Sequence, residues 1–294
     1  MQEFISLIVQ PALIAMLSWW FGTGIILLLV RLPKERFSIA RGFWTLMSVA
    51  ALFFIAQSMR DDSNSSAYLG FISTIVLWGW HELAFLTGWI AGSRKSELEN
   101  NLTFWNRFKQ SVQVIWHHEL ALFATLVVLL LLQIGQPNHT AICTYALLWL
   151  MRLSSKLNLF FGVPQVGEEY LPAHLSYLGS YFKKSAVSLF FYLSMGLSCV
   201  TWVLIVWQGQ SGQVSITPHW VLLATLLGLA IVEHLLMMIP FSLERVWGWA
   251  LKSRWNKKAS HPAKHFTDVL EDQLIIPISI SNPTLLKNSR IESK

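Results

Sequence analysis

Seven long apolar runs constrain the fold of this 294-residue chain more than any other feature. A helix needs about 20 apolar residues to cross the hydrocarbon core of a bilayer, and backbone groups in lipid must be hydrogen-bonded within their own segment. The runs are continuous and do not alternate, which argues against a barrel. We therefore predict an all-α, polytopic integral membrane bundle of about seven transmembrane helices, over residues 9–31, 40–59, 66–91, 110–134, 139–161, 185–208 and 219–249.

Composition supports a membrane location. Hydrophobic residues make up 54% of the chain and charged residues only 13%, about half the charged fraction of soluble domains. The net charge of +6 comes from basic residues beside the apolar runs, where they contact lipid headgroups, so we expect the bilayer and not nucleic acid as a partner. Cys143 and Cys199 lie inside apolar runs and offer no disulfide framework.

The distribution of lysine and arginine predicts the orientation. The first, third and fifth connections and the segment after the last run are rich in these residues, whereas the fourth and sixth contain none. Because cytoplasmic loops carry the excess of positive charge, we expect the N-terminus outside and the C-terminus in the cytoplasm. Residues 1–258 would form the bundle with a cytoplasmic connection at 162–184, and 259–294 a polar tail, loosely ordered.

The connection at 162–184 is the longest between runs. Gly162, Pro164, Gly167 and Pro172 interrupt regular structure there. The stretch after Pro172 has the pattern of a short amphipathic helix at the membrane surface.

Ionisable residues inside the apolar runs are the main functional signal, because such groups are costly in a membrane. The third run contains His81 and Glu82, the fourth His117, His118 and Glu119, and the seventh Glu233 and His234. Counted at the helical rise, one histidine of each group lies roughly 12–15 Å from the cytoplasmic boundary. A shared depth predicts one polar cluster between helices.

A metal centre is the first interpretation of this cluster. Imidazole and carboxylate suit iron, zinc or manganese, and helical bundles hold such ions between facing helices. The histidine and glutamate of each pair are adjacent and so point about 100° apart, unlike the Glu-x-x-His spacing of di-iron bundles. Glu168 and Glu169 are weaker candidates. The predicted ligands are His81, Glu82, His118, Glu119, His174, Glu233 and His234, with His174 folding back from the 162–184 connection to close the site.

The polar cluster has three other possible interpretations. The cluster can be a hydrogen-bonded network that fixes helix register, an axial ligand of a tetrapyrrole, or part of a proton or ion path. On the fifth run, Arg152 is placed either to neutralise the carboxylates or to extend to the cytoplasmic interface, as we expect for Lys156, and Asn158 to cap the helix or the cluster.

The string KLNLFFGVPQVGEEYLPAHLSYLGSYFKK, at residues 156–184, resembles the signature of the PuhE family, photosynthetic complex assembly protein 2 of purple phototrophic bacteria. WHELAFLTG at 80–88, HHELAL at 117–122 and IVEHLLMMIPF at 231–241 are similar to its other blocks, with His118 as the matching histidine. The resemblance covers about 9–255. It implies a bacterial inner-membrane protein that acts in bacteriochlorophyll supply or in assembly of reaction-centre and light-harvesting complexes, and it implies no catalytic activity.

Two functions follow as predictions. The first is an inner-membrane factor for assembly of the photosynthetic apparatus or for bacteriochlorophyll supply, with reaction-centre or light-harvesting subunits, other assembly factors or bacteriochlorophyll as partners. The alternative is an integral-membrane, metal-dependent oxidoreductase that acts on a lipid-soluble or tetrapyrrole substrate. The sequence leaves open whether the protein is an enzyme.

Overall fold

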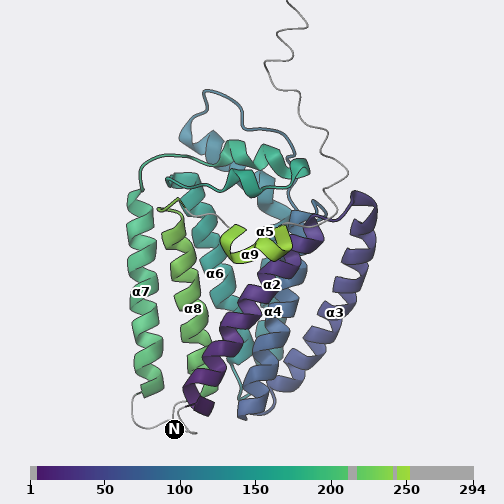
Figure 1. Cartoon of the computed structure of the whole chain (residues 1–294), viewed down its shortest axis with the longest axis vertical. Helices are drawn as coiled ribbons and strands as arrows, with labels where there is room; N and C mark the ends of the chain where they lie inside the picture. The colour runs from purple at the N-terminus through teal and green to yellow at the C-terminus, as the bar shows by residue number, and fades with distance from the viewer. Residues whose placement is uncertain (1–4, 211–216, 241–243, 252–294) are drawn as a thin grey trace, which may run out of the picture. The chain divides into compact units, whose positions relative to one another are not determined.

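The chain forms a bundle of long helices with a cap over one end (Figure 1). The computed structural model describes residues 5–210, 217–240 and 244–251, and the predicted tail at 259–294 lies outside this part. The described residues contain no strand, and their one isolated bridge joins Val163 to Lys184. The predicted all-α class is therefore confirmed for them.

Seven helices of the described part correspond to the seven predicted runs. They are α2 (Gln10–Val30), α3 (Phe37–Ser58), α4 (Asn64–Leu86), α5 (Phe104–Gln133), α6 (Thr140–Phe161), α7 (Leu189–Gln210) and α8 (Pro218–Leu236). By length and composition, six helical segments can cross a membrane, and α6 is the long helix that is not among them. Arg152 and Lys156 lie within α6, so the predicted number of seven crossings, like the orientation, stays a prediction.

Two predicted runs end early. α4 ends at Leu86 and not at 91, because Gly88 turns the chain with a left-handed conformation, φ 71°. The run at 219–249 is not one helix: α8 ends at Leu236, and a separate helix, α9, spans Glu244–Leu251. Pro240 lies between the two helices and cannot continue a helical hydrogen-bond ladder.

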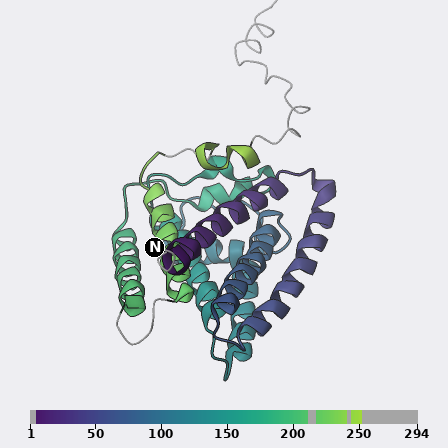
Figure 2. The same cartoon turned by 60° about the horizontal axis from the view of Figure 1, so that its bottom comes forward.

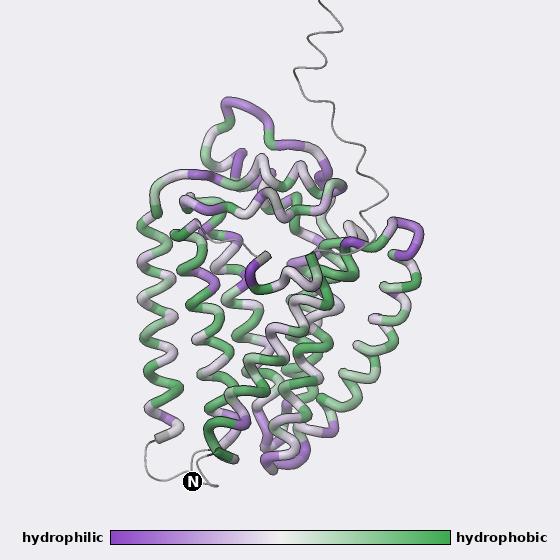
Figure 3. The backbone as a smooth tube through the Cα atoms, viewed as in Figure 1, coloured by the Kyte–Doolittle hydropathy of each residue, from purple (hydrophilic) through white to green (hydrophobic). Residues whose placement is uncertain are grey.

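α4 lies at the centre of the bundle and α7 at its edge. α4 packs against α2, α3, α6 and α8, whereas α7 packs mainly against α8 (Figures 1 and 2). Much of the surface of α7 consists of exposed large apolar side chains, which is the surface that lipid solvates. Figure 3 shows hydrophobic residues along the helices and hydrophilic ones gathered at the two ends and in the cap.

The cap consists of residues 87–103 and 162–188, and it covers one end of α5 and α6 (Figure 1). It includes the short 3-10 helices η3 (Glu168–Tyr170) and η4 (Ala173–Tyr181). Leu175, Leu178 and Tyr181 are the buried residues of η4, so the predicted amphipathic helix is confirmed, in 3-10 form.

Tyr181 ties the cap to the bundle. Its hydroxyl accepts a hydrogen bond from Arg94 Nε at 2.8 Å and donates to the Ser96 carbonyl at 2.8 Å. Its carbonyl and that of Phe160 accept from Arg107 Nη2, at 3.2 and 2.9 Å. The hydrogen bond that Arg94 donates to the Tyr181 hydroxyl raises the pKa of the Arg94 guanidinium above its ordinary value. These hydrogen bonds therefore connect η4 to the 87–103 segment and, through Arg107, to α5 and α6.

Candidate functional site: the polar core around α6

Four polar or aromatic side chains mark one face of α6. Tyr145, Trp149, Arg152 and Lys156 are spaced three or four residues apart, so they lie one above another on the helix. Each of them contacts a polar group of α4 or α5. This face therefore organises the histidine–glutamate pairs of those two helices.

Arg152 pairs with Glu82 of α4. Its Nη2 lies 3.0 Å from Glu82 Oε2, and the two side chains are 39% and 13% exposed. Arg152 is also close enough to Glu233 and His118 to interact with them electrostatically. The prediction that Arg152 neutralises carboxylates of the cluster is confirmed for Glu82.

Lys156 pairs with Glu119 of α5, and both side chains are less than a fifth exposed. Glu119 also accepts a hydrogen bond from Trp149 Nε1 at 3.2 Å, and the ammonium lies 5.6 Å from the centre of the Phe85 ring. The prediction that Lys156 extends to the interface is wrong, because Glu119 offers a charged partner inside the bundle.

His81 is buried beside Tyr145. Its Nε2 lies 3.3 Å from the tyrosine hydroxyl, and that hydroxyl donates to the Leu122 carbonyl at 3.0 Å. Since the hydroxyl proton is used there, the hydroxyl accepts from His81 Nε2. Within the described residues Nδ1 is then buried without a partner.

His118 is the most isolated imidazole of the core. The residue is 1% exposed, and neither ring nitrogen has a hydrogen-bond partner in the described part of the chain. Its ring centre lies 4.6 Å from that of Phe85, and its backbone N–H donates to the Ala91 carbonyl at 2.9 Å. His117 is exposed. The structure thus selects His118 of the two as the core residue, as the family resemblance implied.

The pair on α8 is divided between two environments. His234 is buried, with Nε2 3.0 Å from the Ser154 hydroxyl and Nδ1 2.9 Å from the Ala230 carbonyl. Glu233 is exposed and accepts a hydrogen bond from Trp19 Nε1 at 2.8 Å. Glu233 points in another direction than His234, because adjacent helical residues are about 100° apart, but it stays within electrostatic reach of Arg152 and Glu82.

His174 joins the cap to the end of α4. Its Nε2 lies 2.9 Å from the Leu86 carbonyl, and its ring packs edge-on to Phe37 at 5.8 Å between centres. The imidazole therefore contacts main chain and an aromatic ring of neighbouring helices.

The predicted metal ligands do not gather into one group. Across the residues that the structure describes, no set of three or more His, Cys, Asp or Glu side chains is arranged to hold a metal ion. Glu82 and Glu119 face cations instead, whereas His81 and His118 keep ring nitrogens with unused lone pairs. The metal site, and iron as its occupant, stay predictions.

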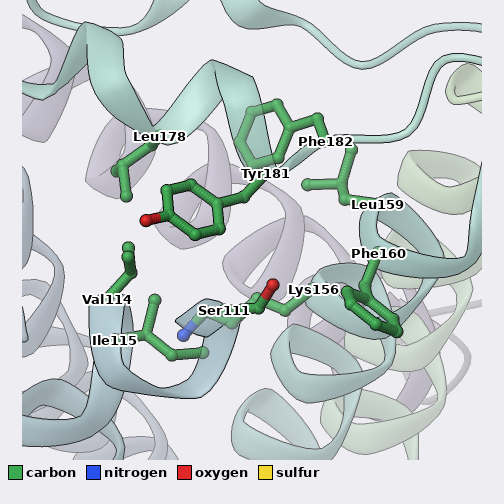
Figure 4. Close-up of a pocket in the computed structure, with 9 residues that line it drawn as sticks. All are labelled: Ser111, Val114, Ile115, Lys156, Leu159, Phe160, Leu178, Tyr181 and Phe182. Atoms are coloured by element: carbon green, nitrogen blue, oxygen red, sulfur yellow. The ribbon is translucent and has the colours of Figure 1, made fainter. Parts of the chain in front are cut away.

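A small cavity lies under the cap. Its volume is about 70 Å³, and Ser111, Lys156 and Tyr181 are among its lining residues (Figure 4). Ligand pockets for drug-sized molecules are several times larger. This cavity accommodates only small molecules and is too small for a tetrapyrrole macrocycle.

Sequence reasoning missed the partners of the ionisable residues: Trp19, Tyr145, Trp149 and Ser154. Three of them lie on α6, and the spacing of Tyr145 and Trp149 with Arg152 and Lys156 was the available signal. Trp19 left no such signal, because its contact with Glu233 joins residues 214 positions apart.

Fold and site define a helical membrane protein in which ion pairs from α6 link it to α4 and α5. Over residues 5–258 the chain matches the family described as protein of unknown function DUF3623, and it belongs to that family. A relative from Rhodobacter capsulatus, described as an uncharacterized 30.4 kDa protein in the puhA 5′ region, is 32% identical over 251 residues, or 82% of this chain and 90% of that protein. No solved structure matches the chain.

Proposed function

We propose that this protein is an inner-membrane factor for assembly of the bacterial photosynthetic apparatus or for its supply of bacteriochlorophyll, as a member of the PuhE family. The observation that carries the proposal is the relative in the puhA 5′ region, which aligns over most of both chains. That location links the relative to photosynthesis and agrees with the resemblance of residues 156–184 to PuhE.

The geometry supports a role through contacts in the bilayer. The ion pairs on α6 hold α4 and α5 in place. The outer faces of α3 and α7 present large apolar side chains, among them Phe43 on α3 and Leu197 on α7. Such surfaces suit lipid and the transmembrane helices of partner subunits, here reaction-centre or light-harvesting subunits or other assembly factors.

Deletion of the gene in its own phototrophic host tests this role. We expect membranes with fewer pigmented complexes per unit of membrane protein, measured by near-infrared absorbance, and recovery with the wild-type gene supplied in trans. Unchanged spectra and unchanged phototrophic growth would contradict the proposal.

Extraction of total pigment from the same cells separates the two forms of the proposal. A defect in pigment supply lowers extractable bacteriochlorophyll, whereas a defect in assembly leaves the pigment but lowers the amount of reaction-centre protein. Immunoblots of a reaction-centre subunit, normalised to a respiratory membrane protein, provide the second quantity.

A metal-dependent oxidoreductase acting on a lipid-soluble or tetrapyrrole substrate is the second candidate. The observation in its favour is His118, a buried imidazole with both ring nitrogens unpartnered in the described part of the chain. Elemental analysis of the detergent-purified protein tests it: stoichiometric iron, zinc or manganese that is lost in a folded His81→Ala, His118→Ala variant supports this function, and metal-free wild-type protein contradicts it.

A further inference from the structure

Four side chains from four helices form a polar patch that is reached from the side of the bundle. We define this lateral polar patch as Trp19 of α2, Glu82 of α4, Arg152 of α6 and Glu233 of α8. Arg152 has a side chain 39% exposed, and Glu233 is exposed as well. In Figure 1, α2 and α8 diverge towards the cap, with α6 behind them and α9 crossing in front of this region. Ionisable groups open to the apolar surface of a membrane bundle are costly and mark functional sites.

Hydrogen bonding within the patch is incomplete. Arg152 Nη2 binds Glu82 Oε2 at 3.0 Å, but Arg152 Nε and Glu82 Oε1 are buried without partners in the described part of the chain. A guanidinium has five N–H donors, and the described residues supply Arg152 with one acceptor side chain. Because Nε is buried while the side chain as a whole is 39% exposed, the donor capacity left for the head group of another molecule lies on the terminal nitrogens of the guanidinium.

The charges of the patch select the class of that molecule. One guanidinium lies within electrostatic reach of two carboxylates, Glu82 and Glu233. Two carboxylates repel an anionic head group, and a cationic one would have to displace Arg152 from Glu82. A neutral head group with carbonyl oxygens avoids both penalties and accepts hydrogen bonds from the guanidinium.

Tryptophans at the edge of the patch favour a flat ring. α9 packs on α2 beside the patch, with Trp247 5.3 Å from Trp19 and Trp249 5.8 Å from Trp20, measured between ring centres. Trp249 remains 44% exposed. Aromatic side chains stack on flat conjugated rings, and Trp19, which donates to Glu233 within the patch, offers such a side chain beside the ionisable groups.

We propose that the lateral polar patch binds a neutral, membrane-soluble amphiphile that carries carbonyl groups on a flat ring and enters from the bilayer between α2 and α8. Arg152 donates to the carbonyl, and Trp19 contacts the ring. This site follows from the contacts themselves, whichever membrane process the protein serves.

Native mass spectrometry of the detergent-solubilised full chain tests the proposal, because it counts bound molecules by mass. The probes are decylubiquinone and bacteriochlorophyll a, two carbonyl-bearing ring amphiphiles, and phosphatidylglycerol as an anionic lipid. We expect saturable binding of one copy of at least one ring probe. Arg152→Met should weaken that binding by about tenfold, the effect of one lost charge-assisted hydrogen bond.

Two further variants keep the test decisive. Arg60→Met removes an exposed arginine from the loop between α3 and α4 and should bind like wild type. The double variant Glu82→Gln, Arg152→Met removes both charges of the ion pair, and Glu233 keeps its hydrogen bond from Trp19, so the protein should fold and still fail to bind. The proposal is overturned if neither ring probe binds saturably, if the folded double variant binds like wild type, or if phosphatidylglycerol shows the same dependence on Arg152.

Discussion

Two ion pairs on the same face of α6 differ in their surroundings. Lys156 and Glu119 are 15% and 18% exposed and lie under the cap, whereas the Arg152 side chain is 39% exposed and opens to the side of the bundle. Glu119 has a second donor in Trp149, but Glu82 keeps one oxygen buried without a partner in the described part of the chain. One pair is enclosed and satisfied, and the other is accessible and incomplete.

The difference in exposure and hydrogen bonding between the two pairs indicates that they have different roles. A buried, fully paired charge holds neighbouring helices in register, and its loss leaves the partner charge uncompensated. An accessible, under-bonded charge adds less stability and has capacity left for a ligand. We therefore assign the Lys156 pair to the fold and the Arg152 pair to binding.

The largest expected effect is that of Lys156→Met. The substitution leaves Glu119 buried without its cation, at a cost of about 3–5 kcal/mol in unfolding free energy. Denaturation of the purified protein in mixed micelles measures the loss, and the double variant Glu119→Gln, Lys156→Met should recover most of it. A single variant as stable as wild type would contradict the structural role.

Arg152→Met should cost less than Lys156→Met, because the Arg152 side chain is 39% exposed, against 15% for Lys156, and so packs less against the protein. The same denaturation experiment gives the comparison. If Arg152→Met destabilised the protein as much as Lys156→Met, the claim that the Lys156 pair stabilises the fold more than the Arg152 pair would be contradicted.

Gly24→Ala tests the attachment of α9 to α2. A Cβ at Gly24 would lie 2.1 Å from Trp249 Cζ2, whereas a Cβ at Gly42 on α3 meets nothing within 4 Å. We expect Gly24→Ala to destabilise by about 1–3 kcal/mol through overpacking, and Gly42→Ala to be neutral or slightly stabilising. Thermal unfolding of the two variants measures both effects, and equal shifts would show that α9 does not pack here.

The smallest effect concerns pH at the loop between α3 and α4. Hydrogen bonds from the Ser63 and Ser66 hydroxyls lower the pKa of Asp61 from its ordinary value of 3.8. A depressed pKa in the folded state means that the stabilisation is present above the unfolded pKa and disappears as the pH falls through the folded one. Asp61→Asn should therefore flatten the acid side of the stability curve, measured by melting temperature between about pH 6 and about pH 3, and a curve as steep as that of wild type would refute the assignment.

The sequence predicted the helices well because bilayer thickness imposes their length. It did not predict the break after Leu236, since apolar residues continue on both sides of Pro240. It identified the ionisable residues of the core but not their partners. Composition cannot distinguish a lysine that extends to the interface from one that pairs with Glu119, because that choice depends on which face of α5 meets α6. The outward direction of Glu233 likewise follows from packing against α2.

The most direct test of the account is complementation of the deletion strain by two double variants that each remove one ion pair without leaving a charge. Both proteins are quantified in the membrane, and the pigmented complexes are measured by near-infrared absorbance. We predict that Glu119→Gln, Lys156→Met restores the complexes in proportion to the protein that accumulates, and that Glu82→Gln, Arg152→Met accumulates but does not restore them. Equal complementation by the two variants, or the reverse result, would contradict the assignment of one pair to the fold and the other to function.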